Sequence, residues 1–389
     1  MKKELMTFSK HFVISCLLLL TSAIIFGISI GASAHFGDNP LAVKLAGEGP
    51  HVFIQDQTLK INYIRGDRDE GFYVDSETFS IESKPNAKTH FALENNAFEF
   101  QLDANFKIPA AVYNDNAPIL AISDIESGFK TFRDFLIANK VINDQLEWTF
   151  GKGHLVLVGD FVDRGFSTTQ VLWFIYKLEQ QAKQHGGLVH FILGNHEIKN
   201  LQGNFKKAKE KYFHVAGILD KQQHELYGEN SFIGRWMSHK NTVELINGYL
   251  FVHGGIHPKT PQFTTSIEEI NQIVRNNYRK LYFPQGEKNK TQFLTSTTTG
   301  PSWYRGYFKS DIDAQDVRKT LEAFNAKAVI VGHTIQSKVN KQFDGQVIAI
   351  DVAHPKDYRN SFPFRSSEGL LIKHEKIYRV LANGEQILL

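Results

Sequence analysis

The segment Leu155-Val156-Leu157-Val158-Gly159-Asp160-Phe161-Val162-Asp163-Arg164-Gly165 decides the fold of this chain. Four apolar residues give the pattern of a short buried strand, and a loop with two aspartates, an arginine and two glycines follows at once. Functional side chains of α/β proteins commonly lie in such loops, because the strand end holds them in place. We therefore expect a strand over 155–158 with a candidate site directly after it.

The same arrangement occurs four more times along the chain. Strands predicted over 119–122, 188–193, 249–252 and 328–331 run into Ser123-Asp124-Ile125-Glu126, Gly194-Asn195-His196-Glu197, His253-Gly254-Gly255 and Gly332-His333-Thr334. Each motif alone has an ordinary explanation as a turn or a helix cap. Five motifs at successive strand ends instead predict one shared site. A sixth strand over 347–351 and helical periodicity after the first two strands predict an α/β domain over 116–389.

The side chains at these strand ends are typical of a metal site. Carboxylate, amide and imidazole ligands in this mixture suit Mn²⁺, Fe or Zn²⁺. The chain has one cysteine, Cys16, and it lies in an apolar N-terminal stretch. This excludes a cysteine-nucleophile mechanism and a structural zinc site built from thiolates.

The order and the residue identities of these motifs resemble those of the calcineurin-like metallophosphoesterases, and within them those of the phosphoprotein phosphatases. Residues 195–203 and 303–307 look like the Shewanella-like bacterial branch, and the resemblance covers about residues 119–372. It implies a sandwich of two mixed β-sheets flanked by helices. It also implies two divalent metal ions (Mn, Fe, Zn or Mg), between which a hydroxide attacks the phosphorus of a phosphomonoester in line.

The resemblance also implies a role for each motif residue. The metal ligands would be Asp124, Glu126, Asp160, Asn195, His253 and His333, with Asp160 between the two ions. His196 would be the general acid, oriented by Asp163, while Arg164 and Arg305 would clamp the phosphate. Two of these residues have plain alternatives: Asp163 as the cap of a helix beginning near Ser167, and Arg305 as a surface arginine beside an aromatic ring.

Residue 126 departs from the family pattern. The first motif normally reads Gly-Asp-x-His-Gly, whereas this chain has Ser123-Asp124-Ile125-Glu126-Ser127-Gly128. Glu126 can ligate a metal directly, or it can act through a neighbouring side chain or water. A carboxylate at this position favours Mn²⁺ or Mg²⁺ over Zn²⁺.

Residues 1–34 have the pattern of a bacterial secretory signal. Lys2, Lys3 and Lys10 precede an uncharged apolar stretch from Phe12, which ends in Ala32-Ser33-Ala34. We expect cleavage before His35 and a periplasmic or secreted protein. The alternative is an uncleaved membrane anchor, because an apolar stretch of about 23 residues can span a bilayer. A lipid on Cys16 is disfavoured, since that residue lies near the start of the stretch.

Residues 35–115 alternate between apolar and polar side chains with period two. Leu59, Ile61 and Tyr63 show this pattern, as do Phe98 and Phe100 with Leu102. We expect a small β-rich N-terminal unit that carries no cluster of titratable residues.

Net charge limits the possible partners. The whole chain carries a formal net charge of +3, and the three lysines and Glu4 of the leader account for +2 of it. The remaining net charge of +1 (3 − 2) does not favour binding to nucleic acid.

The predicted function is that of an exported phosphomonoesterase. Its substrates would be proteins or peptides that carry phosphotyrosine and/or phosphoserine and phosphothreonine, or small phosphomonoesters. Two alternatives stay open: a phosphodiesterase or dinucleoside polyphosphate hydrolase, and an inactive member that binds a phosphate ligand or a partner.

Overall fold

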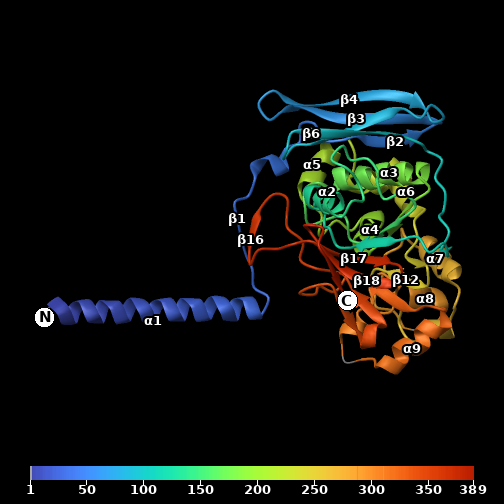
Figure 1. Ribbon diagram of the computed structural model, residues 1–389. Helices are drawn as coiled ribbons and strands as arrows, with labels where there is room; N and C mark the ends of the chain where they lie inside the picture. The colour runs from blue at the N-terminus through green and yellow to red at the C-terminus, as the bar shows by residue number, and fades with distance from the viewer. Residues whose placement is uncertain (1, 287, 310) are drawn as a thin grey trace.

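The computed structural model describes residues 2–286, 288–309 and 311–389. Its centre is a pair of six-stranded mixed sheets (Figure 1). The first sheet has the order β10-β9-β8-β17-β18-β19, and its strands are β8 (Ile119–Ile122), β9 (His154–Val158), β10 (Leu188–Ile192), β17 (Glu368–Lys373), β18 (Lys376–Leu381) and β19 (Gln386–Leu388). Because β8, β9 and β10 are parallel, their carboxyl ends lie at one edge of this sheet.

The second sheet has the order β14-β15-β13-β12-β11-β7. Its strands are β7 (Val112–Tyr113), β11 (Val243–Ile246), β12 (Tyr249–Val252), β13 (Ala328–Val331), β14 (Asn340–Gln342) and β15 (Val347–Ala349). Strands β12, β13 and β15 are parallel, so three more carboxyl ends lie side by side. The predicted fold class, two mixed sheets flanked by helices, is confirmed.

The two sheets enclose an apolar core between their inner faces. Alternate residues of the first sheet, among them Ala121, Val156 and Val158, belong to one buried cluster with Phe251 and Ile330 of the second. Burying such side chains contributes roughly 1.5–3 kcal/mol each. This core makes the sandwich rigid at the level of the strand ends.

Helices cover the outer face of the first sheet. In α2 (Phe129–Ala138) and α3 (Thr168–Gln184) the apolar faces expected from the sequence are buried. The α-helices that follow α3 in the chain are α4 (Asn195–Leu201), α5 (Lys211–Ile218), α6 (Phe232–Ser238), α7 (Ile267–Arg275), α8 (Lys290–Leu294) and α9 (Ala314–Ala323). Several of them connect strands whose ends carry the candidate site.

The N-terminal unit is rich in β structure and packs on α3 (Figure 1). It consists of a three-stranded sheet and a hairpin, formed by β2 (His51–Gln55), β3 (Thr58–Asp67), β4 (Gly71–Ser80), β5 (Asn86–Phe91) and β6 (Asn96–Gln101). The ring of Phe100 stacks on Trp173 of α3 with centroids 4.7 Å apart. Strand β7 then pairs with β11, so the segment before residue 115 also adds a strand to the second sheet.

Helix α1 (Lys2–Ser29) extends away from the rest of the molecule (Figure 1). It is long and apolar enough to cross a membrane, and a signal sequence near the N-terminus has the same properties. Residue 1 of the predicted leader lies outside the described residues. The helix is compatible with a signal sequence and with an anchor.

The segment after α1 is joined to a distant part of the chain. Strand β1 (Ala34–Phe36) pairs antiparallel with β16 (Asn360–Phe362). Nδ1 of His35 lies 3.0 Å from Oγ of Ser361, and Arg359 forms an ion pair with Asp38 at 2.8 Å. Residues 34–38 are therefore attached to the loop that follows β15.

Candidate active site

Side chains from six strand ends, three in each sheet, meet at one edge of the sandwich. They follow β8, β9, β10, β12, β13 and β15 and are Asp124, Asp160, Asn195, His253, His333 and Asp351. All of them except the fully buried His253 line a cavity of about 340 Å³. The five strand ends selected from the sequence thus converge on one cavity, and a sixth joins them.

Two glycines let the neighbouring loops approach each other. A Cβ on Gly159 would lie 2.6 Å from Cα of Gly194 and 2.6 Å from Nδ1 of His253. Gly159 also has a φ of +79°, which favours glycine. The glycines of the two motifs are therefore required for the backbone to bring their aspartate and asparagine together.

Glu197 fixes the loop after β9. Its buried carboxylate accepts hydrogen bonds from the backbone N–H groups of Asp160 at 2.9 Å, Phe161 at 2.7 Å and Gly194 at 2.9 Å. This carboxylate supplies partners for donors that would otherwise be buried without one. It acts on the backbone of the site and not on a ligand.

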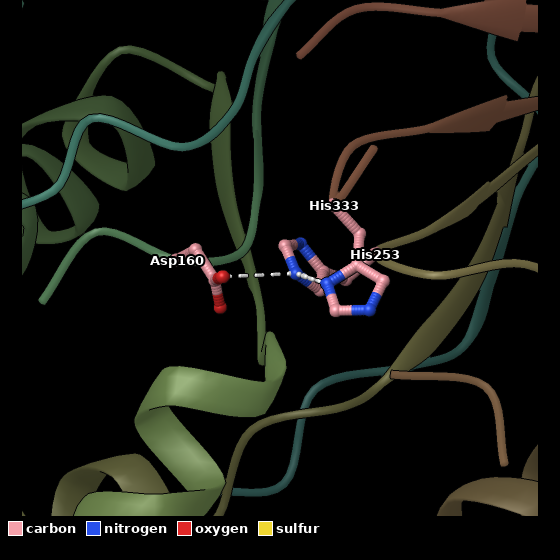
Figure 2. A group of neighbouring side chains, drawn as sticks. All are labelled: Asp160, His253 and His333. Carbon is pink, nitrogen blue, oxygen red and sulfur yellow. Dashed lines mark hydrogen bonds and ion pairs between the residues drawn. The ribbon is translucent and has the colours of Figure 1, made fainter. Parts of the chain in front are cut away.

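Asp160, His253 and His333 form a group suited to a divalent cation. Their ligand atoms all lie within 4.8 Å of one another, and Figure 2 shows the aspartate facing the two histidines. Nε2 of His253 is 3.2 Å from Oδ2 of Asp160 and 3.1 Å from Nδ1 of His333. Nδ1–H of His253 donates to the Val158 carbonyl at 2.8 Å, which directs Nε2 toward Asp160 and His333, where it can act as a ligand once it has lost its proton.

The charges at this group are those that a cation would compensate. Burial alone would raise the pKa of Asp160, but the neighbouring His253 and His196 outweigh it and hold that pKa below its usual range. Burial and then the charge of Asp351 raise the pKa of Asp124 well above normal. For His253, Asp160 and Asp124 overcome the effect of burial and raise the pKa to about 9. Donor types and electrostatics both fit a metal ion.

His196 and Asp163 form a second functional unit beside this group. Nδ1–H of His196 donates to Oδ2 of Asp163 at 2.7 Å, and Asn200 donates to the other carboxylate oxygen at 3.0 Å. Ser167 occupies the N-cap position of α3, and the first backbone N–H of the helix donates to Oη of Tyr212 at 2.7 Å. The carboxylate of Asp163 is thus occupied by His196 and Asn200, so the capping alternative is not observed.

Arg164 and Arg305 line the cavity from opposite sheets. Nη2 of Arg164 lies 3.2 Å from Nε2 of His196, and its other terminal nitrogen forms an ion pair with Glu126. Arg305 donates to the carbonyl of His333 at 2.5 Å and to Oγ1 of Thr334 at 3.0 Å. Arg305 is therefore attached to the loop that carries His333 and is not an isolated surface arginine.

Glu126 reaches the cavity but contacts cations of the protein. One carboxylate oxygen pairs with Arg164 and the other with Lys356. These partners outweigh the effect of burial and lower the pKa of Glu126, so the side chain is ionised. Its direct ligation of a metal stays a prediction.

Asp351 is the main site residue that the sequence analysis missed. Burial, followed by the charges of Glu126 and Asp160, raises its pKa to about 8. The available signal was its position, because it follows a strand as the other five do. Four cations that line the cavity were also missed, and they are Lys199, Lys207, Lys356 and Arg365.

Several residues of these loops have a strained backbone. Asp124, Asp160, Asp163 and His333 have φ values of 55°, 57°, 67° and 64°, in the left-handed region that non-glycine residues seldom adopt. Such conformations persist where surrounding structure imposes them, and they are common at functional sites.

The sequence model of the calcineurin-like phosphoesterases matches residues 117–337, which is more than half of the chain. This chain belongs to the calcineurin-like phosphoesterase family. All five motif-bearing strand ends of this calcineurin-like phosphoesterase lie inside the matched range. The protein is a metal-dependent phosphoesterase hydrolase.

The proteins similar to this calcineurin-like phosphoesterase include phosphatases. Shewanella-like protein phosphatase 1 of Plasmodium berghei is 26% identical over 271 residues, which are 66% of this chain and 72% of the relative. Shewanella-like protein phosphatase 2 of Arabidopsis thaliana is 24% identical over 315 residues, 68% and 78% of the two chains. The crystal structure of a cold-active protein-tyrosine phosphatase from a psychrophilic Shewanella species aligns with a TM-score of 0.73 and 27% identity, covering 88% of this chain and 99% of that one.

Proposed function

We propose that this enzyme is a two-metal phosphomonoesterase that dephosphorylates proteins, including phosphotyrosine residues. The observation that carries the proposal is the Asp163–His196 pair beside the Asp160, His253 and His333 group in one cavity. A proton donor beside a cation site is the arrangement needed to cleave an ester with a poor leaving group.

Each residue of the cavity has a task in this reaction. Divalent cations bound at the strand ends would polarise the phosphoryl oxygens and lower the pKa of water. The planar guanidinium groups of Arg164 and Arg305 would hold two phosphate oxygens from opposite sides. With Arg164 turned from Nε2 to the phosphate, the protonated His196 would give its Nε2 proton to the leaving oxygen, and Asp163 would stabilise the imidazolium charge before that transfer.

Support for a protein substrate comes from the cavity rim and from the relatives. Ile335 lines the cavity and is exposed, and the 82% exposed Phe364 precedes the cavity-lining Arg365. Exposed apolar side chains beside a cationic phosphate site suit a phosphorylated side chain carried on a peptide. The names of the similar proteins, two protein phosphatases and one protein-tyrosine phosphatase, agree with this substrate class.

Location in the cell belongs to the same proposal. The apolar helix α1 at the N-terminus supports a protein exported through a secretory signal, which would act outside the cytoplasm.

Hydrolysis of p-nitrophenyl phosphate by protein without residues 1–34 tests the enzyme class. EDTA should abolish turnover, and Mn²⁺, Mg²⁺ or Zn²⁺ should restore it. Asp160→Asn and His196→Asn should each lower kcat by at least about 100-fold, whereas His214→Asn, on the exposed part of α5, should leave it unchanged. Absence of turnover with every metal would refute the proposal and favour an inactive binding protein.

Substrate class needs a second comparison. Peptides carrying phosphotyrosine, phosphoserine or phosphothreonine should be hydrolysed with a higher kcat/KM than bis-p-nitrophenyl phosphate. Faster hydrolysis of the diester would favour a phosphodiesterase.

A further inference from the structure

The side chain of Asp351 is largely buried, and its carboxylate has no partner among the described residues. Its side chain lines the cavity at 6% exposure, and no hydrogen bond or ion pair joins its carboxylate to any residue that the structure describes. The two other aspartates at the strand ends do have partners. Oδ2 of Asp124 accepts from the His333 N–H at 3.1 Å, and Oδ1 of Asp160 accepts from the His196 N–H at 2.9 Å. A buried carboxylate without a partner calls for a cation.

The backbone holds Asp351 beside the metal-binding loop. The N–H of Ile350 donates to the Val331 carbonyl at 2.9 Å, and the N–H of Gln336 donates to the Asp351 carbonyl at 2.9 Å. Residues 336 and 352 also form a parallel bridge. Asp351 is therefore fixed from both sides by the segment that carries His333, as a preorganised ligand should be.

Glu126 is bound by two protein cations in the same cavity. Both of its oxygens are used, one by Arg164 and one by Lys356. Binding a metal ion would require Glu126 to give up at least one of these ion pairs. Its position instead suits a residue that orients Arg164 toward the phosphate.

We propose that Asp351, together with Asp124 and Asp160, holds the first of the two metal ions, and that Glu126 positions Arg164 and Lys356. The proposal rests on the two-metal function above. It replaces the histidine of the family's first motif with a carboxylate from the second sheet, which follows β15, the strand next to β13. Three carboxylates give an all-oxygen position that suits Mn²⁺ or Mg²⁺, beside a second position that contains two imidazoles.

The group whose ligand atoms lie within 4.8 Å of one another contains Asp160 but neither Asp124 nor Asp351. Three carboxylates that are all ionised repel one another unless a cation lies between them. Metal binding should therefore draw the side chains of Asp124 and Asp351 inward, while the backbone contacts of Asp351 stay in place.

The test compares Asp351→Asn with Glu126→Gln, which make the same chemical change at two carboxylates of one cavity. Isothermal titration with Mn²⁺ after removal of metals should give two ions for the wild type and for Glu126→Gln. In Asp351→Asn one of the two should bind about 100-fold more weakly or not at all. Glu126→Gln should instead raise KM for p-nitrophenyl phosphate. Loss of an ion in Glu126→Gln but not in Asp351→Asn would overturn the proposal.

Manganese-loaded wild-type crystals give a readout that needs no variant. Anomalous scattering at the manganese edge should show one ion within ligand distance of an Asp351 oxygen, and an ion that instead contacts Glu126 would refute the assignment. The same experiments distinguish a failure of this proposal from a failure of the proposed function. The two-metal enzyme would be refuted if the wild-type protein bound fewer than two ions, or bound two ions without turnover. Either result would hold regardless of the role of Asp351.

Discussion

The carboxylate of Asp163 lies 2.7 Å from Nδ1 of His196, and this contact decides which nitrogen of the imidazole faces the cavity. A carboxylate accepts, so Nδ1 carries a proton and Nε2 is directed at the substrate side. Asn200 holds the second oxygen of Asp163 and keeps the pair from rotating.

Asp163→Asn should therefore lower catalysis in a way that depends on the leaving group. The amide cannot stabilise an imidazolium, so kcat for phenyl phosphate should fall by about 100-fold or more. For 2,4-dinitrophenyl phosphate, whose leaving group needs no proton, the decrease should be less than about tenfold. Steady-state kinetics on both esters measure the difference, and equal decreases would argue against His196 as the acid.

Arg305→Lys should weaken substrate binding more than it slows the chemistry. Arg305 is attached through His333 and Thr334, and a lysine keeps the charge but loses the planar fork. We expect KM for p-nitrophenyl phosphate to rise by about tenfold, with a smaller change in kcat. Arg318→Lys, on the exposed face of α9, is the matched control. An unchanged KM in Arg305→Lys would remove Arg305 from the phosphate site.

Glu197→Ala should destabilise the folded protein. The substitution leaves buried N–H groups of the loop after β9 without an acceptor, among them those of Asp160 and Phe161. The free energy of unfolding, measured with urea, should fall by about 3 kcal/mol. Glu210→Ala removes a glutamate whose side chain is 85% exposed and should change it little. Equal stability of the two variants would show that the loop does not depend on Glu197.

His51 should make folding stability depend on pH. Burial, assisted by Lys211 and opposed by Glu48, lowers the pKa of this histidine to about 4 from its ordinary 6.5. Between these values the unfolded chain binds a proton that the folded protein does not, so stability is lost as pH falls below 6.5. The contribution lost between pH 8 and pH 5 is about 2 kcal/mol.

Thermal unfolding of the wild type and of His51→Gln across this pH range measures that contribution. The variant should lose less stability on acidification, whereas His214→Gln, with an exposed side chain, should behave as the wild type. Parallel curves for the wild type and His51→Gln would contradict the prediction.

The local pattern of apolar and polar residues predicted much of the fold, because each central strand is a short apolar run bounded by turn-forming residues. The strands at 119–122, 249–252 and 328–331 have the predicted bounds, and the one predicted over 155–158 begins one residue earlier. Strand β11 was not predicted because Val243-Glu244-Leu245-Ile246 contains an acid. Glu244 is buried there because His190 of the first sheet lies 2.6 Å away, a contact that no local pattern contains.

The candidate site likewise contains residues that local motifs predicted and residues that they did not predict. Asp160, His196 and His253 belong to recognisable motifs, so their meeting at one edge followed from the parallel strands. Lys356 reaches Glu126 across 230 residues of sequence, and no motif marks it. Asp351 was assigned to the body of its strand, whereas β15 ends at residue 349 and frees that side chain for the cavity.

The pairing of β1 with β16 joins the predicted cleavage site to the loop that carries several cavity-lining residues. The peptide bond that a signal peptidase would cut, between Ala34 and His35, lies inside β1. A protease cuts a strand that is extended and not yet paired. On the pathway in which the leader is removed, cleavage would therefore come before this pairing, and the segment carrying Asp351, Lys356 and Arg365 would gain its contacts with β1 only afterwards. The order of export and final folding would then depend on the pairing of only two residues, His35 and Phe36, with β16.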